Sequence, residues 1–578
     1  MDKLTNREVA QLFATVADML EIKGENIHRI LSYRRAAETL SELPRDINTI
    51  YASGQLLDLP GIGQTLADKI EELLTMGKLT FYERLSAEVP PGLVEMLAVP
   101  GLGAKKVARF WKELGITTLA DLKAAAEAGK LAGLPGMGAK SEQKIIEGIE
   151  ALARRTDRIS IGEAYPAAKR VLEHLLALPE SLHGDIAGSL RRRRATIGDI
   201  DLLIASHDAG PIMATFVALP EVARVLGHGP TKSSIELHSG LQIDLRVLPP
   251  ERYGTLLAYF TGSKEHNVHM REIAREQGLS LNDNEIKRLD GGPDILCATE
   301  EEVYATFGLP WIPPELREDR GEIEAARAGQ LPNLITLGDI RGDMQLHTTW
   351  SDGKTSVLGM AEAALAQGRR WMLVTDHSFG LGIVQGLKAE DIERQRVEID
   401  EANRILAGRF TVLHGTECEI RADGTLDFSD DDLAKFDIVL ASMHTSLRQP
   451  REQVTARMLR AISHPLVSII GHPRGQLIPD REPADLDMDA IFTAALEHDV
   501  ALEINANPHR LDLDDVHARR AVELGVKLTI STDAHDPEHF ALMHYGVSTA
   551  RRGWVSAAQV VNTWPLERVL VWVKGRQA

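Results

Sequence analysis

The sequence has little cysteine, no long apolar run and too few basic residues to balance its acidic ones. Two cysteines, Cys297 and Cys418, cannot build a disulfide framework, which favours a reducing cytoplasm. No stretch approaches the ~20 apolar residues that a membrane-spanning helix needs. The first residues, MDKLTNREVA, are charged and contain no apolar core of signal-peptide length. We therefore expect a soluble, cytoplasmic protein with no membrane partner.

The shortage of positive charge bears on nucleic-acid binding. The formal net charge is −19, and an acidic balance of this size argues against a nucleic-acid partner. Binding depends on local patches, however, and two segments are locally basic: HRILSYRRAAE (28–38) and SLRRRRATIG (189–198). The net charge therefore weakens a nucleic-acid hypothesis without excluding it.

Length and local pattern predict several domains. At about 150 residues per domain, the 578 residues correspond to roughly four. Residues 1–155 have helical periodicity throughout, with Gly and Pro between the helices. Strands are predicted from about 156 to 250, mixed helix and strand over 251–318, and a Pro-rich, charged linker over 319–340. After 341, strands and helices alternate.

Three segments of the helical region repeat one pattern. They are LPGIGQTLADKIEEL (59–73), VPGLGAKKVARFWKEL (99–114) and LPGMGAKSEQKIIEGI (134–149), each an apolar-Pro-Gly-apolar-Gly run before a helix. Glycine permits a positive φ and the close approach of another backbone, and amides at a helix start attract anions. A tight turn between packed helices is the alternative for any one copy. Three copies, two of them followed by lysines, favour contact with phosphates of a nucleic-acid backbone, which reads no base.

The stretch IGDIDLLIAS (197–206) places Asp199 and Asp201 on the same side of a predicted half-buried strand. A solvent-facing polar edge would explain two such carboxylates. The alternative is a divalent cation between them, since two like charges otherwise repel. Asp244, in the predicted strand LQIDLRV, supplies a third carboxylate. Three carboxylates on neighbouring strands can hold two cations about 4 Å apart, which suits in-line phosphoryl transfer.

The segments around these strands suit a nucleoside triphosphate. GSLRRRR, upstream, offers a Gly-Ser turn and several guanidiniums that would neutralise a triphosphate. YFTGSKEHNVHMR (259–271), downstream, predicts a Tyr-Phe pair, a Gly turn and a helix that ends at Arg271. Aromatic faces stack on sugars or bases, although ordinary core packing also explains Tyr259 and Phe260.

Seven apolar runs after residue 341 each end in a polar side chain of a metal-binding type. Strands that alternate with helices fold into a parallel barrel whose C-terminal strand ends meet at one mouth. Imidazoles and carboxylates together suit Zn²⁺, Mn²⁺ or Fe²⁺, and a water between such ions becomes a hydroxide that attacks phosphorus. The side chains at the strand ends are His347, Asp352, Asp376, His377, Glu417, His444, His472, Asn507, Asp533 and His535.

The part before residue 319 resembles the family X DNA polymerases, which are small gap-filling repair enzymes. GSLRRRRATIGDID keeps the family's spacing from the Gly-Ser turn to Asp-x-Asp, and IDLRVLPPERYG and YFTGSKEHNVHMR follow in the family's order. The Pro-Gly-x-Gly repeats resemble helix-hairpin-helix motifs. The resemblance implies that Asp199, Asp201 and Asp244 are catalytic metal ligands, with Mg²⁺ or Mn²⁺ as the cofactor.

The same resemblance implies roles for further residues. Those implied around the triphosphate are Arg158, Gly188, Ser189, Arg192 and Gly198, and those along the nucleotide and nascent base pair are Tyr259, Phe260, Gly262, Asn267 and Arg271. NIHRILSYRRAA resembles the family's 5′-phosphate pocket, with His28, Arg29 and Tyr33. Lys69 falls where related enzymes carry a Schiff-base lysine, with a solvated helix face as the alternative. The glycines implied in DNA-backbone contact are Gly61, Gly63, Gly101, Gly103, Gly136 and Gly138.

Residues 341–578 resemble the PHP (polymerase and histidinol phosphatase) domain along their whole length. Carried over by position, the resemblance implies the metal ligands His347, Asp352, His377, Glu417, His444, His472, Asp533 and His535. The family's first motif begins His-x-His, but its first position here is Gln345. An amide oxygen is a poorer ligand than imidazole for zinc-like ions. One of the three metal sites of the family is therefore expected to be weak or empty.

Together these features are typical of a bacterial family X polymerase with a C-terminal PHP domain. We expect a helical helix-hairpin-helix region, an α+β nucleotidyltransferase palm and thumb, and a PHP (β/α)7 distorted TIM-like barrel. The expected domains are 1–80 (5′-phosphate-binding, lyase-like), 81–155 (helix-hairpin-helix), 156–250 (palm), 251–318 (thumb), 319–340 (linker) and 341–578 (PHP).

The expected function is the filling of short gaps in gapped or nicked DNA from deoxynucleoside triphosphates, by a monomer associated with the nucleoid. The PHP domain is expected to add metal-dependent 3′-5′ exonuclease activity or 3′-end and abasic-site processing. Two other hypotheses stay open. One is a PHP nuclease or phosphatase whose polymerase half only grips DNA, and the other is a polymerase whose PHP domain is purely structural.

Overall fold

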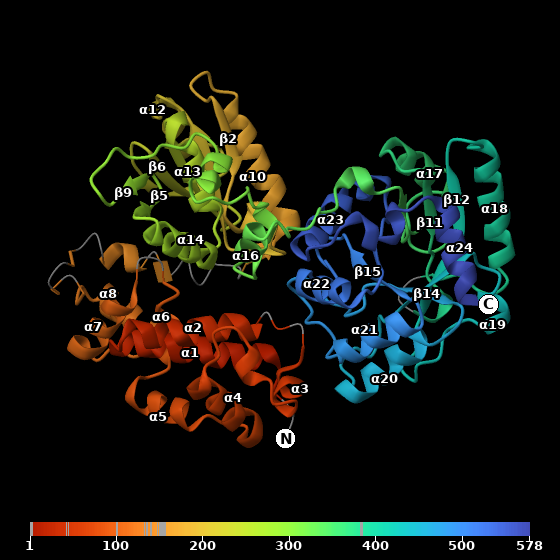
Figure 1. The fold of residues 1–578 in the computed structure, drawn as a ribbon, viewed down its shortest axis with the longest axis horizontal. Coiled ribbons are helices and arrows are strands. Elements are labelled where there is room, and N and C mark those ends of the chain that lie inside the picture. Colours follow the sequence, from red (N-terminus) through yellow and green to blue (C-terminus); the bar gives the residue numbers. More distant parts are fainter. Residues whose placement is uncertain are drawn as a thin grey trace. The chain divides into compact units, whose positions relative to one another are not determined.

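The computed structural model describes residues 4–577 except 42, 44, 100–101, 132, 135–136, 139–141, 147, 150–157 and 382–384. The chain divides into two compact units, Met1–Thr156 and Asp157–Ala578 (Figure 1). Within the described residues, no helix has both the length and the apolar composition to span a membrane.

The first unit is helical, as predicted. Its first helix begins at a capping box, in which Thr5 and Glu8 satisfy each other's backbone amides, and ends at Gly24 in the left-handed conformation. One contiguous core runs through the unit and includes the fully buried Phe13 and Phe110. The helices are α1 (Asn6–Lys23), α2 (Ile27–Ser41), α3 (Ile47–Ala52), α4 (Gln64–Met76), α5 (Thr80–Glu88), α6 (Gly92–Met96), α7 (Ala104–Leu114) and α8 (Leu119–Glu127).

The second unit begins with a five-stranded sheet in the order β2-β4-β7-β6-β5. Its strands are β2 (His183–Ile186), β4 (Asp199–Ala205), β5 (Val222–His228), β6 (Lys232–Leu237) and β7 (Gln242–Leu248). The predicted strands of this region are confirmed, and β6 and β7 form an antiparallel hairpin around the predicted turn. The central pair, β4 and β7, is parallel. Two further strands of two residues each, β1 (Ile159–Ser160) and β3 (Thr196–Ile197), pair antiparallel and form a small separate sheet.

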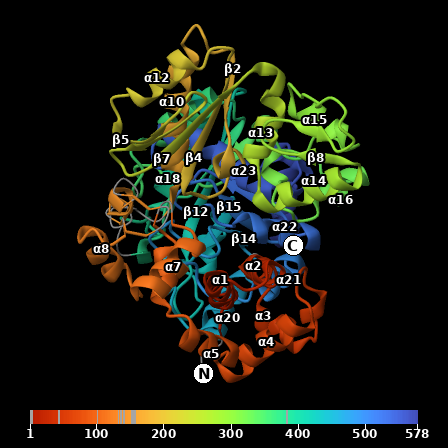
Figure 2. The same ribbon diagram turned by 90° about the vertical axis from the view of Figure 1, so that its left-hand side faces the viewer.

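The two faces of this sheet are covered differently. Helices α10 (Ile161–Leu176) and α12 (Gly210–Val217) pack on the face that carries Ile200, Leu202 and Ile204 of β4 (Figure 2). On the other face, Leu203 and Ala205 pack against α13 (Tyr253–Thr261). This second face is therefore covered at one end of β4, and the aspartates occupy its other end.

The thumb region follows α13. It contains α14 (Lys264–Glu276), β8 (Leu279–Leu281), β9 (Ile286–Arg288) and α15 (Glu300–Thr306) around a core of its own. The helix predicted to end at Arg271 continues to Glu276, because Met270, Ile273 and Ala274 extend its buried stripe. The segment expected to be a linker carries α16 (Glu322–Arg327), which packs on the same core through Ile323 and Ala326.

The C-terminal barrel confirms the predicted fold class. Seven parallel strands follow one another in chain order: β10 (Gly342–Asp343), β11 (Trp371–Val374), β12 (Thr411–Glu419), β13 (Ile438–Ser442), β14 (Val467–Ile470), β15 (Ala501–Asn505) and β16 (Leu528–Ser531). A parallel bridge between Leu346 and Ala534 joins the two ends of the sheet. The strands therefore form a nearly closed barrel, with their carboxyl ends at one mouth.

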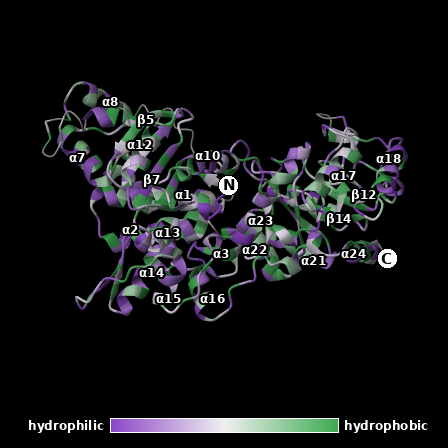
Figure 3. Cartoon of the chain, turned by 90° about the horizontal axis from the view of Figure 1, so that it is seen from above, coloured by the Kyte–Doolittle hydropathy of each residue, from purple (hydrophilic) through white to green (hydrophobic). Residues whose placement is uncertain are grey.

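Helices surround this barrel (Figure 3). They are α17 (Val357–Ala366), α18 (Ile392–Ile405), α19 (Asp430–Leu433), α20 (Arg451–Ile462), α21 (Met488–Glu497), α22 (Asp515–Leu524), α23 (Met543–Arg552) and α24 (Leu566–Gln577). Hydrophobic and hydrophilic residues both occur around the same helices in Figure 3, as expected when one face of a helix is buried.

Candidate active sites

The three predicted carboxylates of the palm lie on neighbouring strands. Asp201 of β4 stands opposite Asp244 of β7 in the parallel ladder, and Asp199 precedes Asp201 by two residues on the same face. The intervening Ile200 is fully buried on the opposite face. A half-buried strand carries two carboxylates on one face because that face is open at this end of the sheet.

The electrostatics of this face fit a divalent cation. Burial, followed by the neighbouring Asp199 and Asp244, raises the pKa of Asp201 to about 7. Lys232 lies 3.5 Å from Asp244 across the hairpin. In the described part of the chain, every group of three or more metal-type side chains with ligand atoms within 4.8 Å of one another lies in the barrel. Asp199, Asp201 and Asp244 do not form such a group, but their charges repel one another, and a bound cation would relieve this repulsion.

Position 188 has room only for glycine, because it lies against Asp201. Its φ is +62°, and a Cβ at this position would lie 2.3 Å from Oδ2 of Asp201. Ser189 follows it in the single turn of α11 (Gly188–Arg191). Arg158 donates from Nε to Oγ1 of Thr196 at 2.9 Å, and its Nη1 would lie 3.3 Å from a Cβ at Gly198. The predicted Gly-Ser turn, Arg158 and Gly198 therefore lie next to the carboxylates.

Arg192 lies in the same region, but other protein groups hold its guanidinium. Nη1 donates to the carbonyl oxygen of Thr261 at 2.6 Å, and Nε donates to Oε1 of Glu318 at 3.1 Å. A Cβ at Gly262 would lie 3.0 Å from the same Nη1. Arg192 thus ties the Gly-Ser turn to the Gly turn after α13, and the role in triphosphate binding implied for it remains a prediction.

The predicted nucleotide-facing residues come from α13 and α14. The Asn267 side-chain amide donates to the Tyr259 carbonyl at 2.7 Å, and Nε of Arg271 donates to the Asn267 carbonyl at 3.2 Å. Phe260 packs its ring 4.3 Å from the guanidinium of Arg246, which lies two residues after Asp244 on the same face of β7. The structure therefore places Phe260 beside the strand that carries one of the carboxylates.

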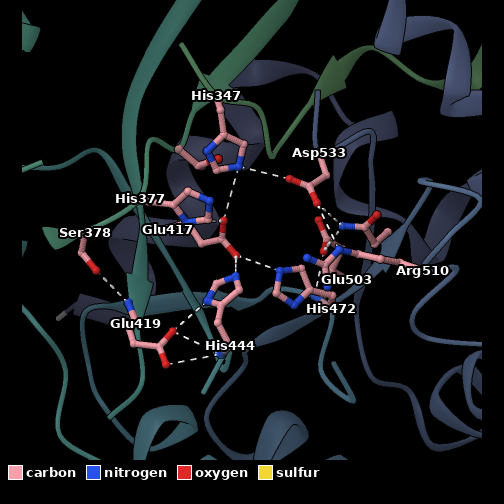
Figure 4. Close-up of polar contacts among 12 residues, drawn as sticks. His347, His377, Ser378, Glu417, Glu419, His444, His472, Glu503, Arg510 and Asp533 are labelled. Atoms are coloured by element: carbon pink, nitrogen blue, oxygen red, sulfur yellow. Dashed lines mark hydrogen bonds and ion pairs between the residues drawn. The ribbon is translucent and has the colours of Figure 1, made fainter. Parts of the chain in front are cut away.

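The barrel gathers its eight predicted ligands at one mouth. Figure 4 shows six of them, namely His347, His377, Glu417, His444, His472 and Asp533. Three groups could each hold an ion: His347, Asp352, His377 and His535; His377, Glu417 and His444; and His347, Glu417 and Asp533. His472 joins them through a contact of 2.8 Å between its Nε2 and Oε1 of Glu417. Glu417 is the hub, since imidazole nitrogens of His347, His377 and His444 also lie 3.1–3.3 Å from its carboxylate.

The charges of this cluster are those of a metal centre. Burial alone would raise the pKa of Glu417, but His377 and His444 hold it well below its usual value. Burial would likewise lower the pKa of His347, yet Asp533 and Glu417 raise it well above the usual value. Nδ1 of His347 and Nδ1 of His472 are buried without a hydrogen-bond partner among the described residues. Buried nitrogens in this state fit a site that binds cations.

The sequence matches known families and curated proteins. A family profile described as "DNA polymerase beta thumb" matches residues 256–318, "Helix-hairpin-helix domain" matches 4–79, and "SAM-like Helix-hairpin-helix tandem" matches 93–151. DNA polymerase/3′-5′ exonuclease PolX of Bacillus subtilis (strain 168) is 39% identical over 570 residues, 98% of this chain and 99% of the relative. The chain belongs to the PolX family.

Two eukaryotic relatives match only part of the chain. DNA polymerase lambda of Rattus norvegicus is 24% identical and that of Arabidopsis thaliana 25% identical, each over 54% of this chain. These matches cover 56% and 62% of the relatives. The resemblance to family X DNA polymerases is thus confirmed, and polymerase and exonuclease activities of this family imply dependence on divalent metal ions.

Gln345 departs from the His-x-His pattern inside the PolX barrel. The residue is fully buried, and neither atom of its side-chain amide has a hydrogen-bond partner among the described residues. The backbone carbonyl oxygen of Gln345 accepts from the backbone amide of Asp533 at 3.0 Å. Gln345 therefore lies next to the group of His347, Glu417 and Asp533. That group therefore has three strong ligands, His347, Glu417 and Asp533, and lacks the further imidazole that the family's pattern would place beside it.

Replacement of Gln345 by His should strengthen this metal site. An added imidazole would raise its affinity for zinc-like ions by about tenfold or more. Elemental analysis after dialysis against a weak chelator would measure the ions retained per chain, with Gln367→His on the surface turn after α17 as the control. Equal metal content in Gln345→His and wild type would show that Gln345 does not limit this site.

Sequence analysis missed four polar residues at the mouth of the barrel. Glu419 accepts from Nδ1 of His444 at 2.7 Å and so orients that ring (Figure 4). Asn505 bridges Glu503 and Asp533, with contacts of 3.3 and 3.2 Å, and Nε of Arg510 lies 3.4 Å from Asp533. The alternation in ECE (417–419) and EIN (503–505) was an available signal, because alternate residues of a strand share a face.

In the first unit, the repeated glycine turns adopt one geometry where they are described. The amide of Ile62 donates to the carbonyl of Leu59, and Leu102 with Val99 and Met137 with Leu134 repeat this bond. Gly63 and Gly103 are the N-caps of α4 and α7 without a side-chain cap, and a Cβ at Gly63, Gly103 or Gly138 would meet nothing within 4 Å. Gly61 has a φ of +73°. Gly101 and Gly136 lie outside the described residues.

The predicted 5′-phosphate residues gather partly around Phe81. The cationic groups of Arg29, Lys69 and Arg84 lie 5.1–5.6 Å from its ring centre, and Tyr33 stacks on it at 5.9 Å. A pocket of about 190 Å³ is lined by three cationic residues, two acidic residues and three apolar ones: Lys23, Arg29, Arg84, Glu25, Glu88, Leu20, Phe81 and Leu85. Burial, followed by the charge of Arg29, lowers the pKa of Lys69. His28 is exposed and does not line this pocket.

Proposed function

We propose that this chain fills short gaps in DNA by adding deoxynucleotides to a 3′ end, and that its barrel removes nucleotides from 3′ ends. Membership of the PolX family supports both activities. One observation carries the synthetic activity: Asp201 and Asp244 stand opposite each other on parallel strands, with Asp199 on the same face. We further propose that the protein acts as a monomer on the nucleoid in the cytoplasm.

In the synthetic reaction, Asp199, Asp201 and Asp244 would hold Mg²⁺ or Mn²⁺. Such ions, when bound, favour the ionised 3′ hydroxyl and neutralise charge on the α-phosphate and the leaving pyrophosphate. Gly188 leaves room for this arrangement because it has no Cβ, and the Gly188–Ser189 turn presents amide and hydroxyl donors to the phosphates. Arg158 supplies a guanidinium beside the same edge. Tyr259 and Phe260 would face the sugar and base.

In the degradative reaction, the histidines and carboxylates of the barrel mouth would hold Zn²⁺, Mn²⁺ or Fe²⁺. Ions of this kind, when bound, would make hydroxide available near neutral pH for hydrolysis of a terminal phosphodiester. Glu417 gathers four imidazoles, and Glu419 and Asp533 hold the rings of His444 and His347 by hydrogen bonds. Damaged 3′ ends and abasic sites present the same phosphodiester chemistry, so we include them as substrates of this site.

We propose that the cationic pocket at Phe81 binds the 5′-phosphate on the far side of a gap. Arg29 and Arg84 supply the charge, and the lowered pKa of Lys69 makes more of its free amine available for Schiff-base formation with a 5′-deoxyribose phosphate. The lyase role is the second candidate function of this unit.

Gap filling on a duplex with a 5′-phosphate tests the proposal. With Mn²⁺, wild type should fill a one-nucleotide gap about tenfold faster with a 5′-phosphate than with a 5′-hydroxyl, since charge-assisted hydrogen bonds to the phosphate favour binding. Arg29→Ala should lose this preference. Arg34→Ala, on the same helix but paired with Asp18 and Glu21, should keep it.

The same duplex with a 5′-deoxyribose phosphate tests Lys69. Borohydride should trap a covalent adduct with wild type and with Lys78→Ala, which changes an exposed lysine after α4, but not with Lys69→Ala.

In the gap-filling test, no extension of any gapped duplex at any metal concentration would reject synthesis and favour a nuclease that only binds DNA. Equal rates with both 5′ ends would reject the pocket's role alone.

A further inference from the structure

A buried arginine of the barrel contacts segments of the palm and of the thumb. Arg552, the last residue of α23, has a side chain that is 3% exposed. Its Nη1 donates to the backbone carbonyl of Arg192 at 2.6 Å and to Oε1 of Glu318 at 2.8 Å, and its Nη2 donates to Asp515 at 2.8 Å. This single guanidinium thus contacts the palm, the end of the thumb and the barrel's own α22.

Glu318 is the centre of the contact. The same oxygen that accepts from Arg552 accepts from Nε of Arg192 at 3.1 Å, and its other oxygen lies 3.6 Å from Arg194. Burial alone would raise the pKa of Glu318, but Arg552 and Arg192 hold it well below its usual value. The carboxylate is therefore charged, and two arginines from different domains are held against it. Removal of either would take one positive partner from this buried carboxylate and weaken the contact between the domains.

Both turns that are proposed to flank the nucleotide are tied to Arg192. Arg192 directly follows α11, in which Gly188 lies against Asp201. Nη1 of Arg192 donates to the carbonyl oxygen of Thr261, at the turn after Phe260. Arg552 holds the backbone of Arg192, and Glu318 holds its side chain. The position of the Gly-Ser turn relative to the Gly262 turn thus depends on a residue of the barrel.

We propose that Arg552 is a positioning residue for nucleotide addition, which holds Arg192 so that the two turns around the incoming nucleoside triphosphate keep their spacing. This inference rests on the proposed synthetic function. Arg552 acts through Arg192 and Glu318 and does not itself contact the nucleotide. The barrel therefore serves the polymerase site as well as its own metal centre.

Other contacts hold the barrel against the palm. Ser160 donates to the carbonyl of Pro508 at 2.9 Å, and Leu511 and Tyr545 of the barrel pack in the palm core. The neighbouring Arg551 makes a similar ion pair, 2.7 Å from Glu315, but does not contact Arg192. Loss of Arg552 should therefore displace the Arg192 segment without separating the domains, and Arg551 is a matched control.

The test is steady-state gap filling by the full chain, with the deoxynucleoside triphosphate varied. Arg552→Met should raise KM for the nucleotide by about tenfold, because small misplacements of binding groups are costly, while its 3′-5′ exonuclease rate and its DNA affinity stay within twofold of wild type. Arg551→Met should leave KM within twofold. Arg552→Lys, which keeps the charge but not all three contacts, should fall between. The double variant Arg192→Met/Arg552→Met should be no worse than Arg192→Met alone.

Each result decides the proposal. An Arg552→Met enzyme with the KM of Arg551→Met would overturn it, as would fully additive effects in the double variant. Should Arg552→Met lose the exonuclease or unfold at low temperature, Glu318→Gln replaces it, because this variant keeps the volume and removes the charge that both arginines share. A KM of Glu318→Gln for the deoxynucleoside triphosphate equal to that of wild type would then overturn the proposal. Absence of extension by wild type would instead refute the proposed function.

Discussion

The variant Asp201→Asn is expected to lose nucleotide addition almost completely, with a fall of about 10³-fold or more in the rate of gap filling. Asp201 neighbours both Asp199 and Asp244 on one face of the sheet. The neutral amide of asparagine cannot replace the Asp201 carboxylate as a charged ligand for cations at this face. Metal ions supply several kcal/mol of transition-state stabilisation in phosphoryl transfer, and each 1.36 kcal/mol is about a factor of ten. Primer extension under single-turnover conditions measures the loss.

The same variant should be more stable than wild type when metal is absent. Asp201 has a pKa of about 7 in the folded protein against an ordinary value of 3.8. Between these values the folded state binds the proton more tightly than the unfolded state, so stability falls as pH rises from about 4 to about 7. Asparagine does not ionise, so Asp201→Asn should not show this loss of stability with rising pH. Thermal unfolding in EDTA should give Asp201→Asn the higher Tm at pH 8, by a few degrees, and no difference near pH 4.

Two comparisons make this result specific. Asp208→Asn changes a carboxylate in the turn after the far end of β4, where it accepts from the Gly210 amide, and should keep full synthesis. The 3′-5′ exonuclease of Asp201→Asn should match wild type, because its ligands lie in the barrel. Retention of gap filling by Asp201→Asn would refute the assignment of the palm carboxylates.

The variant Glu417→Gln is expected to have the second large effect, on degradation. The Glu417 carboxylate lies within 3.3 Å of a nitrogen of each of His347, His377, His444 and His472. An amide would lose the charge that holds cations among these rings, and we expect a fall in exonuclease rate of about 10³-fold or more. Elemental analysis should show loss of metal, and gap filling should stay within twofold of wild type.

A carboxylate of the same barrel away from the mouth provides the control. Glu401→Gln changes a half-exposed carboxylate of α18 that accepts from Nε of Arg404 at 2.9 Å, and should retain both the metal and the exonuclease. Equal, negligible exonuclease in wild type and Glu417→Gln would favour a purely structural barrel. High exonuclease in Glu417→Gln would place the degradative site elsewhere in the chain.

Much of the catalytic architecture was predictable from local pattern. Alternation on 199–205 predicts that Asp199 and Asp201 share a face, and the structure confirms this with Ile200 buried behind them. Seven apolar runs ending in ligands predict a parallel barrel with one mouth, and the structure shows seven parallel strands with the predicted side chains together. These properties depend on the two-residue period of a strand and on the common direction of parallel strands.

Other features depend on segments that are distant in the chain. Glu419, Asn505 and Arg510 were missed because their importance comes from His444 and Asp533, which follow other strands of the barrel. His28 was grouped with Arg29 by motif, yet His28 is exposed and is not among the residues that line the pocket of Arg29. Adjacent residues of a helix point in different directions, so a motif alone does not place both at one site.

The amino-acid sequence by itself determined the helical first unit, the aspartates on one face of β4 and the ligands at the ends of the barrel strands, because each follows from periodicity within one segment. The tertiary structure alone decided that Asp244 lies opposite Asp201, that Glu417 is the hub of the histidines, and that Arg552 holds Arg192. Strand register and side-chain partners arise from the packing of distant segments, and no local period encodes them.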